Sequence, residues 1–360
     1  MQDLPDELLL KILRFMTFQE ICKLSRINQR FQRLFNDKSL WQKIRIYCKI
    51  VPDWALEKMI ESEIKYLNLR HCTIPNGLKP IKNEMKLNYL NISSCNGNDN
   101  FLSEMVERSK DLKTLDLSES QINLVSRCIS RLPEQSSLAA IDFSMMNNSF
   151  LTPNYLSIQV VKLLINNCRH LTGVSFWGTA LSDDTIEYIC QNLSHKTLRI
   201  SFCNEDILDE HIAILVKQCN KLEHLDLRET NITFSAVSKI AKSLSKSLIS
   251  LLLPEKVGLE LGLHSVVDQE KLEIFKELQI LRYLHIGDWE GSLWFWNEND
   301  EYVFNKNIHK EKLSQHFPHL IINQEIWNGV IDDTSPIYKF FQLDGIKRDP
   351  WSNFQPDFVH

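Results

Sequence analysis

A short apolar pattern recurs through most of this 360-residue chain. Its form is L-x-x-L-x-L-x-x-C/S/T, and its first core positions are residues 67, 90, 115, 141, 174, 198, 225, 251 and 284. Most steps are 23 to 27 residues, whereas 141–174 and 251–284 are 33 residues each and must carry insertions. The alternation predicts short strands with one apolar face. Because one unit cannot bury that face alone, neighbouring units must stack.

The segments between the expected strands have the apolar spacing of helices. We predict helices over residues 103–110, 155–167, 183–191, 209–218 and 235–244. Strand-plus-helix units of this length predict an α/β leucine-rich-repeat solenoid, curved, with short parallel strands inside and helices outside. Cys72, Cys95 and Cys203 follow their strands where a small side chain turns inward, and we expect them to fill the core.

The first 44 residues have another pattern, a set of short amphipathic helices. Pro5 suits the first turn of a helix, and Thr17 with Glu20 forms a capping-box arrangement for a second one. The first helix carries the apolar residues Leu8, Leu9, Ile12, Leu13, Phe15 and Met16. A unit of about 40 residues is too small to bury all this apolar surface. Either the rest of the chain covers it or a partner protein does.

Leu4-Pro5 followed by Glu7-Leu8, the apolar ladder and Asp37…Leu40-Trp41 together resemble an F-box. Members of that family bind the Skp adaptor, which links them to a cullin–RING ubiquitin ligase. The resemblance implies that the adaptor interface, or its internal support, includes Leu4, Pro5, Leu8, Ile12, Leu13, Met16, Ile21, Phe31, Leu40 and Trp41. The sequence does not separate contact from support. Many F-boxes have a proline where this chain has Met16-Thr17-Phe18, but Thr17 can still cap the second helix.

The two patterns together resemble F-box/leucine-rich-repeat proteins of the cysteine-containing, Skp-two-like class. We expect four segments: an N-terminal three-helix F-box (1–45), a helical connector (46–63), about nine to ten leucine-rich repeats (64–325) and a C-terminal aromatic tail (326–360). A further strand is expected at residues 319–323. The tail is too aromatic for a solvated segment. It either caps the last repeat or folds back along the concave face.

The residues that alternate with the core leucines form the concave strand face. From Trp177 onward this face gains residue types that dominate binding energy at protein interfaces. We therefore predict the substrate-binding residues Trp177, Arg199, Arg228 and His285. Arg199 and Arg228 would suit a phosphorylated partner. The alternatives are a solvated sheet face and, for Trp177, an insertion that folds over it.

The composition argues against several other classes. A net charge of −5 gives no basic excess for nucleic acid, and no apolar run approaches the ~20 residues that span a membrane. The start lacks a secretory pattern, so we expect a reducing compartment, the cytoplasm and/or nucleus, with the nine cysteines as thiols. No phosphate-binding, metalloprotease or nucleophile motif is present, and His309, His316 and His319 lack accompanying cysteines. No cofactor, metal or catalytic residue is expected.

The expected function is the substrate-recognition subunit of an SCF (Skp–cullin–F-box) E3 ubiquitin ligase. It would bind the Skp adaptor by the F-box and a protein substrate by the repeats, for ubiquitination and degradation, as a monomer within the complex. The mechanism is proximity, which raises effective concentration without a catalytic residue in this chain. One alternative is a non-catalytic binding scaffold that does not recruit a cullin. Another is an enzyme whose site the sequence does not reveal.

Overall fold

The structure is a computed structural model that describes residues 4–16, 18–46, 50–144, 146, 155–287, 294–296, 302–304 and 308–322. The chain divides into two compact units. The first consists of Met1–Ile141 with Asn166–Arg169, and the second of Asp142–Ile165 with His170–His360. Each unit is described by itself below.

The first unit begins with helices. These are α1 (Asp6–Leu13), α2 (Phe18–Leu24), α3 (Gln29–Phe35) and the 3₁₀ helix η1 (Lys38–Trp41). Asn28 caps α3, because its side chain accepts the N–H of Phe31 at 2.9 Å. The core of this region is Leu9, Leu13, Leu34, Leu40 and Trp41.

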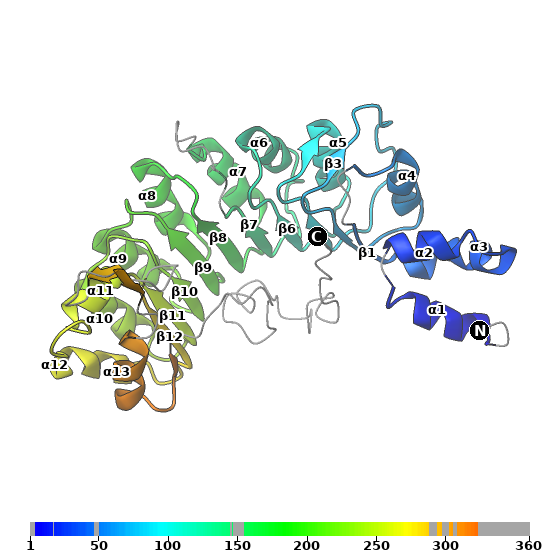
Figure 1. The fold of residues 1–360 in the computed structure, drawn as a ribbon. Helices are drawn as coiled ribbons and strands as arrows, with labels where there is room; N and C mark the ends of the chain where they lie inside the picture. Colours follow the sequence, from blue (N-terminus) through cyan, green and yellow to red (C-terminus); the bar gives the residue numbers. More distant parts are fainter. Residues whose placement is uncertain are drawn as a thin grey trace. The chain divides into compact units, whose positions relative to one another are not determined.

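The repeats of the first unit place parallel strands in the order β1-β2-β4-β6-β7. Their bounds are β1 (Lys43–Arg45), β2 (Tyr66–Asn68), β4 (Tyr89–Asn91), β6 (Thr114–Asp116) and β7 (Ala140–Asp142). The connections contain the helices α4 (Asp53–Glu61), α5 (Asp99–Glu107) and α6 (Ile122–Ser130), and the short paired strands β3 (Thr73–Ile74) and β5 (Asn96–Gly97). Figure 1 shows α5 and α6 on one side of this strand layer.

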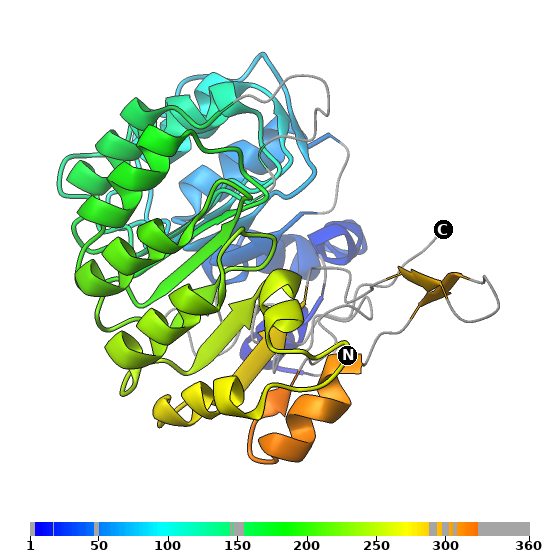
Figure 2. The ribbon, with the colours of Figure 1, turned by 90° about the vertical axis from the view of Figure 1, so that its left-hand side faces the viewer.

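The second unit repeats the arrangement with strands in the order β8-β9-β10-β11-β12-β15. The strands are β8 (Gly173–Trp177), β9 (Arg199–Cys203), β10 (His224–Asp226), β11 (Ser250–Leu253), β12 (Tyr283–Ile286) and β15 (Ile321–Ile322). The helices are α7 (Ile158–Asn167), α8 (Asp183–Asn192), α9 (Asp209–Gln218), α10 (Phe234–Leu244), α11 (Glu255–Glu260), α12 (Gln269–Leu272), η2 (Glu273–Glu277) and α13 (Ile308–His316). An antiparallel pair, β13 (Trp294–Trp296) and β14 (Tyr302–Phe304), precedes α13. Figure 2 shows the helices α8–α10 side by side in one layer and the strands in a second.

A left-handed residue follows many of the strands and turns the chain inward. His71, Ser94, Glu119 and Glu229 hold this position with φ of 60°, 53°, 56° and 55°. The next residue is the C/S/T of the sequence pattern. Its side chain hydrogen-bonds a backbone carbonyl, usually that of the preceding repeat, as Cys95 Sγ does with Leu69 O at 2.9 Å. Ser120 bonds Ile92 O of the preceding repeat in the same way, whereas Thr230 bonds Leu227 O of its own repeat. The small polar residue therefore satisfies a buried backbone carbonyl.

The expected fold is confirmed, with N-terminal helices followed by parallel strands and helices on an α/β plan. Each of the nine expected strands forms, and the strand expected at residues 319–323 is β15, beside β12. Two details were wrong. The helix predicted at residues 103–110 is α5, which begins at Asp99 and ends at Glu107. The helical pattern predicted over the first 44 residues ends earlier, because η1 ends at Trp41 and Ile44 lies in β1, the first strand of the sheet. Thr17 and the tail at residues 326–360 lie outside the described residues.

Candidate binding surfaces

An exposed apolar stripe runs along α1. Leu8 and Ile12 are 43% and 44% exposed, and Phe15 just beyond the helix is 71% exposed. These residues recur at i, i+4 and i+7, so they share one side of the helix. Leu9 and Leu13 point to the core instead. Since α1 is apolar on both sides, the Leu8–Ile12–Phe15 stripe has the character of a docking surface rather than of a solvated helix face.

The ten predicted adaptor residues separate by burial into possible contacts and supports. Leu8, Ile12 and Pro5 are exposed, and Leu4, Met16 and Phe31 are half-buried. Leu13, Ile21, Leu40 and Trp41 are buried. The Trp41 indole donates to Phe35 O at 2.7 Å, and its ring lies edge-on to the rings of Phe35 and Phe18. The buried members support the helices, and the exposed ones are available for contact.

Sequence reasoning did not single out Phe15 and Ile27 as adaptor contacts, although they are the most exposed large apolar residues of this region, at 71% and 63%. The sequence could have identified Phe15, because it continues the helical spacing of Leu8 and Ile12. No spacing pattern could have identified Ile27, since it lies in the turn between α2 and α3.

The N-terminal helices are joined to the first repeat by packed contacts. Trp54 of α4 stacks on Phe18 with ring centroids 6.0 Å apart. Strand β1 pairs with β2, and Ile44 opposes Leu67. The backbone N–H of Lys65 also donates to Gln42 O at 3.0 Å. The strand pairing and the aromatic stack join the N-terminal helices directly to the first repeat.

The polar residues that end strands β2, β4, β6 and β7 cap their own backbone. Asn68, Asn91, Asp116 and Asp142 each accept the N–H of the residue two positions later through Oδ1. This is an Asx-type turn repeated from strand to strand. Most of the polar strand face is thus engaged in its own structure, which the sequence pattern alone did not reveal.

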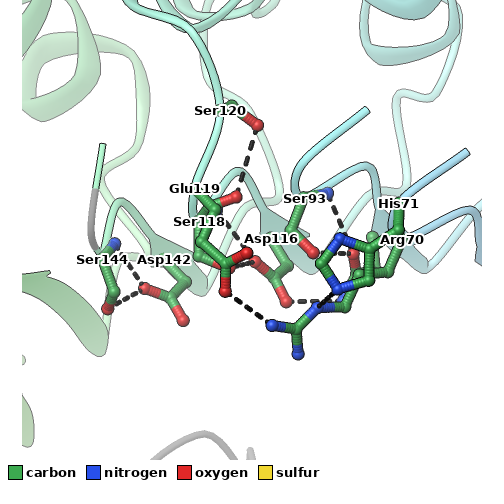
Figure 3. A network of polar contacts seen from close by, with 10 residues as sticks. Arg70, His71, Ser93, Asp116, Ser118, Glu119, Ser120, Asp142 and Ser144 are labelled. Atoms are coloured by element: carbon green, nitrogen blue, oxygen red, sulfur yellow. Dashed lines mark hydrogen bonds and ion pairs between the residues drawn. The ribbon is translucent and has the colours of Figure 1, made fainter. Parts of the chain in front are cut away.

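Asp116 is the centre of a polar network in the first unit (Figure 3). Its Oδ1 accepts the N–H and hydroxyl of Ser118 at 3.0 and 2.7 Å, and its Oδ2 accepts the Asn91 amide at 2.6 Å. Arg70 reaches past β4 to pair with Glu119 at 2.6 Å. Burial raises the pKa of Asp116 above its ordinary value, against the opposing effects of Ser118 and Arg70.

The four predicted substrate-binding residues all lie on the strand face of the second unit, but not as one cluster. Arg199 starts β9 opposite Gly173 and His224, whereas Trp177 ends β8 opposite Cys203. Four residues of strand separate the two positions, roughly 13 Å along the sheet. His285 lies opposite Leu252, in the middle of β12.

Arg228 has a structural partner. Its guanidinium donates to both oxygens of Asp226, at 2.9 and 2.7 Å, and the two side chains are 2% and 4% exposed. Asp226 Oδ2 also accepts the Ser201 hydroxyl at 3.2 Å. Arg228 is therefore committed to a buried ion pair within its own repeat, which weakens the prediction that it contacts a substrate phosphate.

Six cysteines of the repeats are buried core residues, namely Cys72, Cys95, Cys128, Cys168, Cys190 and Cys219, whereas the side chain of Cys203 lies outside the described part. Burial raises the pKa of Cys95, Cys168 and Cys190 to about 12. Such thiols are poor nucleophiles and poor metal ligands at neutral pH. In the described part of the chain no three His, Cys, Asp or Glu side chains gather as a metal site. His316, one of the three histidines noted in the sequence, instead bonds Gln269 and Lys312 O.

Among the helices that the structure describes, none is both long and apolar enough to cross a membrane.

Two comparisons with known proteins gave matches. Residues 1–47 match the F-box-like family. The solved structures similar to this chain include a crystal structure of an internalin from Listeria monocytogenes, with 16% sequence identity and a TM-score of 0.40. That match covers 74% of this chain and 79% of the internalin. The F-box-like region coincides with the helices that carry the exposed stripe.

Proposed function

We propose that this chain is the substrate-recognition subunit of an SCF E3 ubiquitin ligase. F-box domains generally bind a Skp adaptor, and the F-box-like match at residues 1–47 supports that partner here. The observation that carries the proposal is the Leu8–Ile12–Phe15 stripe, which is apolar and exposed on a helix whose opposite side is already buried. Its burial against a partner would be favourable by about 25 cal/mol per Å².

The repeats would hold a protein substrate for ubiquitination and subsequent degradation. Their strand face is continuous with the F-box-like helices through β1, so within the first unit the adaptor surface and the strands have a fixed spacing. A fixed spacing favours transfer by proximity. In this proposal the chain itself is not an enzyme, and it acts in the cytoplasm and/or nucleus.

The first test is the affinity of the purified full chain for a purified Skp adaptor, measured by calorimetry. The double variant Leu8→Asp/Ile12→Asp should lose binding by about a hundredfold or more, because two central apolar contacts become charged. The matched control is Leu163→Asp, since Leu163 is a helical leucine of the second unit with 42% exposure. The control should bind like the wild type.

Urea unfolding of each variant keeps this test interpretable, because the exposed leucines should change the unfolding midpoint little. Undiminished adaptor binding by the folded double variant would refute the adaptor surface.

The alternative is a scaffold that takes the adaptor without a cullin. Reconstitution of this chain with the adaptor and a cullin, followed by gel filtration, separates the two. Co-elution of all three supports the ligase subunit, and a stable pair that excludes the cullin supports the scaffold.

A further inference from the structure

Four side chains form a small patch on the strand face of the first unit. Thr114 and Asp116 are two residues apart in β6 and therefore point to the same face of the sheet. Their partners in β4 are Tyr89 and Asn91, paired as Tyr89 with Thr114 and Asn91 with Asp116. We refer to these four residues as the β4–β6 patch.

Within the described residues no cation is hydrogen-bonded to the Asp116 carboxylate, although Arg70 acts on it through space. Its hydrogen-bond donors are neutral, namely the Asn91 amide and the backbone and hydroxyl of Ser118. The cation of this network, Arg70, is paired with Glu119 (Figure 3). A desolvated carboxylate is unfavourable without a cation, and the raised pKa of Asp116 has the same cause.

Thr114 gives a second, independent indication. The residue is only 9% exposed, and its hydroxyl Oγ1 has no hydrogen-bond partner. A buried polar atom without a partner costs about 1–3 kcal/mol. Because Thr114 and Asp116 share a face of β6, one donor group with several N–H bonds could serve both.

We propose that the β4–β6 patch receives an arginine side chain from a protein partner. A guanidinium has five donors in a rigid plane, so it can bond Asp116 Oδ2 and Thr114 Oγ1 together, and it also stacks on aromatic rings such as that of Tyr89. A lysine ammonium is a point charge without this planar fork. The inference rests on the proposed function insofar as the bound segment belongs to a substrate; its chemistry concerns a patch apart from the adaptor surface.

The test uses the full chain and four pools of nine-residue peptides, randomised except for a central Arg, Lys, Gln or Glu. Binding of each labelled pool is measured by fluorescence anisotropy. The Arg pool should bind best, and Asp116→Asn should reduce its affinity about tenfold, as for the loss of a charge-assisted hydrogen bond. Asn fits the site, because β2 and β4 carry Asn68 and Asn91 at the same position.

Two further variants separate binding from structure. Thr114→Val removes the hydroxyl at nearly constant shape, so it should weaken the Arg pool without lowering stability, since the hydroxyl has no partner in the free chain. Asp111→Asn removes the same charge from an exposed position in the same repeat and should have no effect.

Equal binding of the Arg and Gln pools would overturn the proposal, as would an Arg preference that survives in Asp116→Asn. Equal binding of the Arg and Lys pools would also overturn it, because the patch would then detect charge alone. Adaptor binding measured on the same preparation distinguishes the two proposals. A chain that binds the adaptor but shows no Arg preference loses only the inference about the patch, and one with an Arg preference but no adaptor loses only the ligase role.

Discussion

The F-box-like helices and the strand face of the repeats differ in how they treat their surface groups. On α1, Leu8 and Ile12 are apolar, exposed and unused by the fold. On the strands, polar residues such as Asn91 are buried and capped onto their own backbone. The helices thus leave apolar side chains exposed, whereas the repeats use most of their polar strand residues internally. Recognition by the repeats should depend on a few exceptional residues rather than on the whole face.

Cysteine reactivity should show the largest contrast between the two regions. Cys22 in α2 is half-buried, whereas Cys95 is buried with a pKa of about 12 in place of 9.0. Three units of pKa lower the thiolate fraction about a thousandfold. Iodoacetamide at pH 8, followed by mass spectrometry, should label Cys22 first and Cys95 only after unfolding. Rapid labelling of Cys95 in the native chain would contradict its burial.

Trp41 and Leu8 should separate support from contact within the F-box-like region. Trp41→Ala removes a ring that is 2% exposed and should lower the free energy of unfolding by about 3–5 kcal/mol. Leu8→Ala should cost less than about 1 kcal/mol in unfolding but should still weaken adaptor binding. Urea unfolding and calorimetry measure the two effects. Similar losses of stability in both variants would mean that Leu8 is part of the core.

Two arginines of the strand face, Arg228 and Arg70, should differ in how much each stabilises the folded chain. Arg228→Ala leaves Asp226 buried and unpaired, which should cost about 3 kcal/mol of stability. Arg70→Ala breaks a pair whose arginine side chain is 42% exposed, which should cost about 0.2–1 kcal/mol. The two losses are compared from the midpoints of urea unfolding, provided that the free energy of unfolding falls with urea at the same slope in both variants. If Arg228→Ala is as stable as Arg70→Ala, Arg228 is free to serve a partner after all.

Asp116 should give the smallest effect, and one that depends on pH. Its folded-state pKa is raised above 3.8, so the folded chain binds the proton more tightly than the unfolded one. Stability from this group is therefore present at acid pH and is lost as the pH rises through the folded-state pKa. Asp116→Asn should be as stable as the wild type near pH 3 and more stable at pH 7. A stability difference of the opposite sign at pH 7 would show that Arg70 outweighs the burial of the carboxylate in the free chain.

The sites could be predicted only in part. The ten predicted adaptor residues follow from the F-box resemblance, but burial alone separates Trp41 from Leu8. Arg228 matched the residue types that bind partners, yet it lies two residues after Asp226 and folds onto it. The pairing of Arg70 with Glu119 joins residues 49 positions apart in the sequence. The periodicity of the apolar residues therefore does not predict this ion pair.

The sequence by itself determined the repeat, its strand positions and the separate character of the first 44 residues. Apolar spacing specifies which face of a local element must be buried, and that requirement is written in nearby residues. The tertiary structure decided which polar groups are already satisfied. Whether a cation bonds Asp116, or Thr114 has a hydrogen-bond partner, depends on neighbours brought close by stacking. Side chains more than 20 residues apart carry no local signature of that contact.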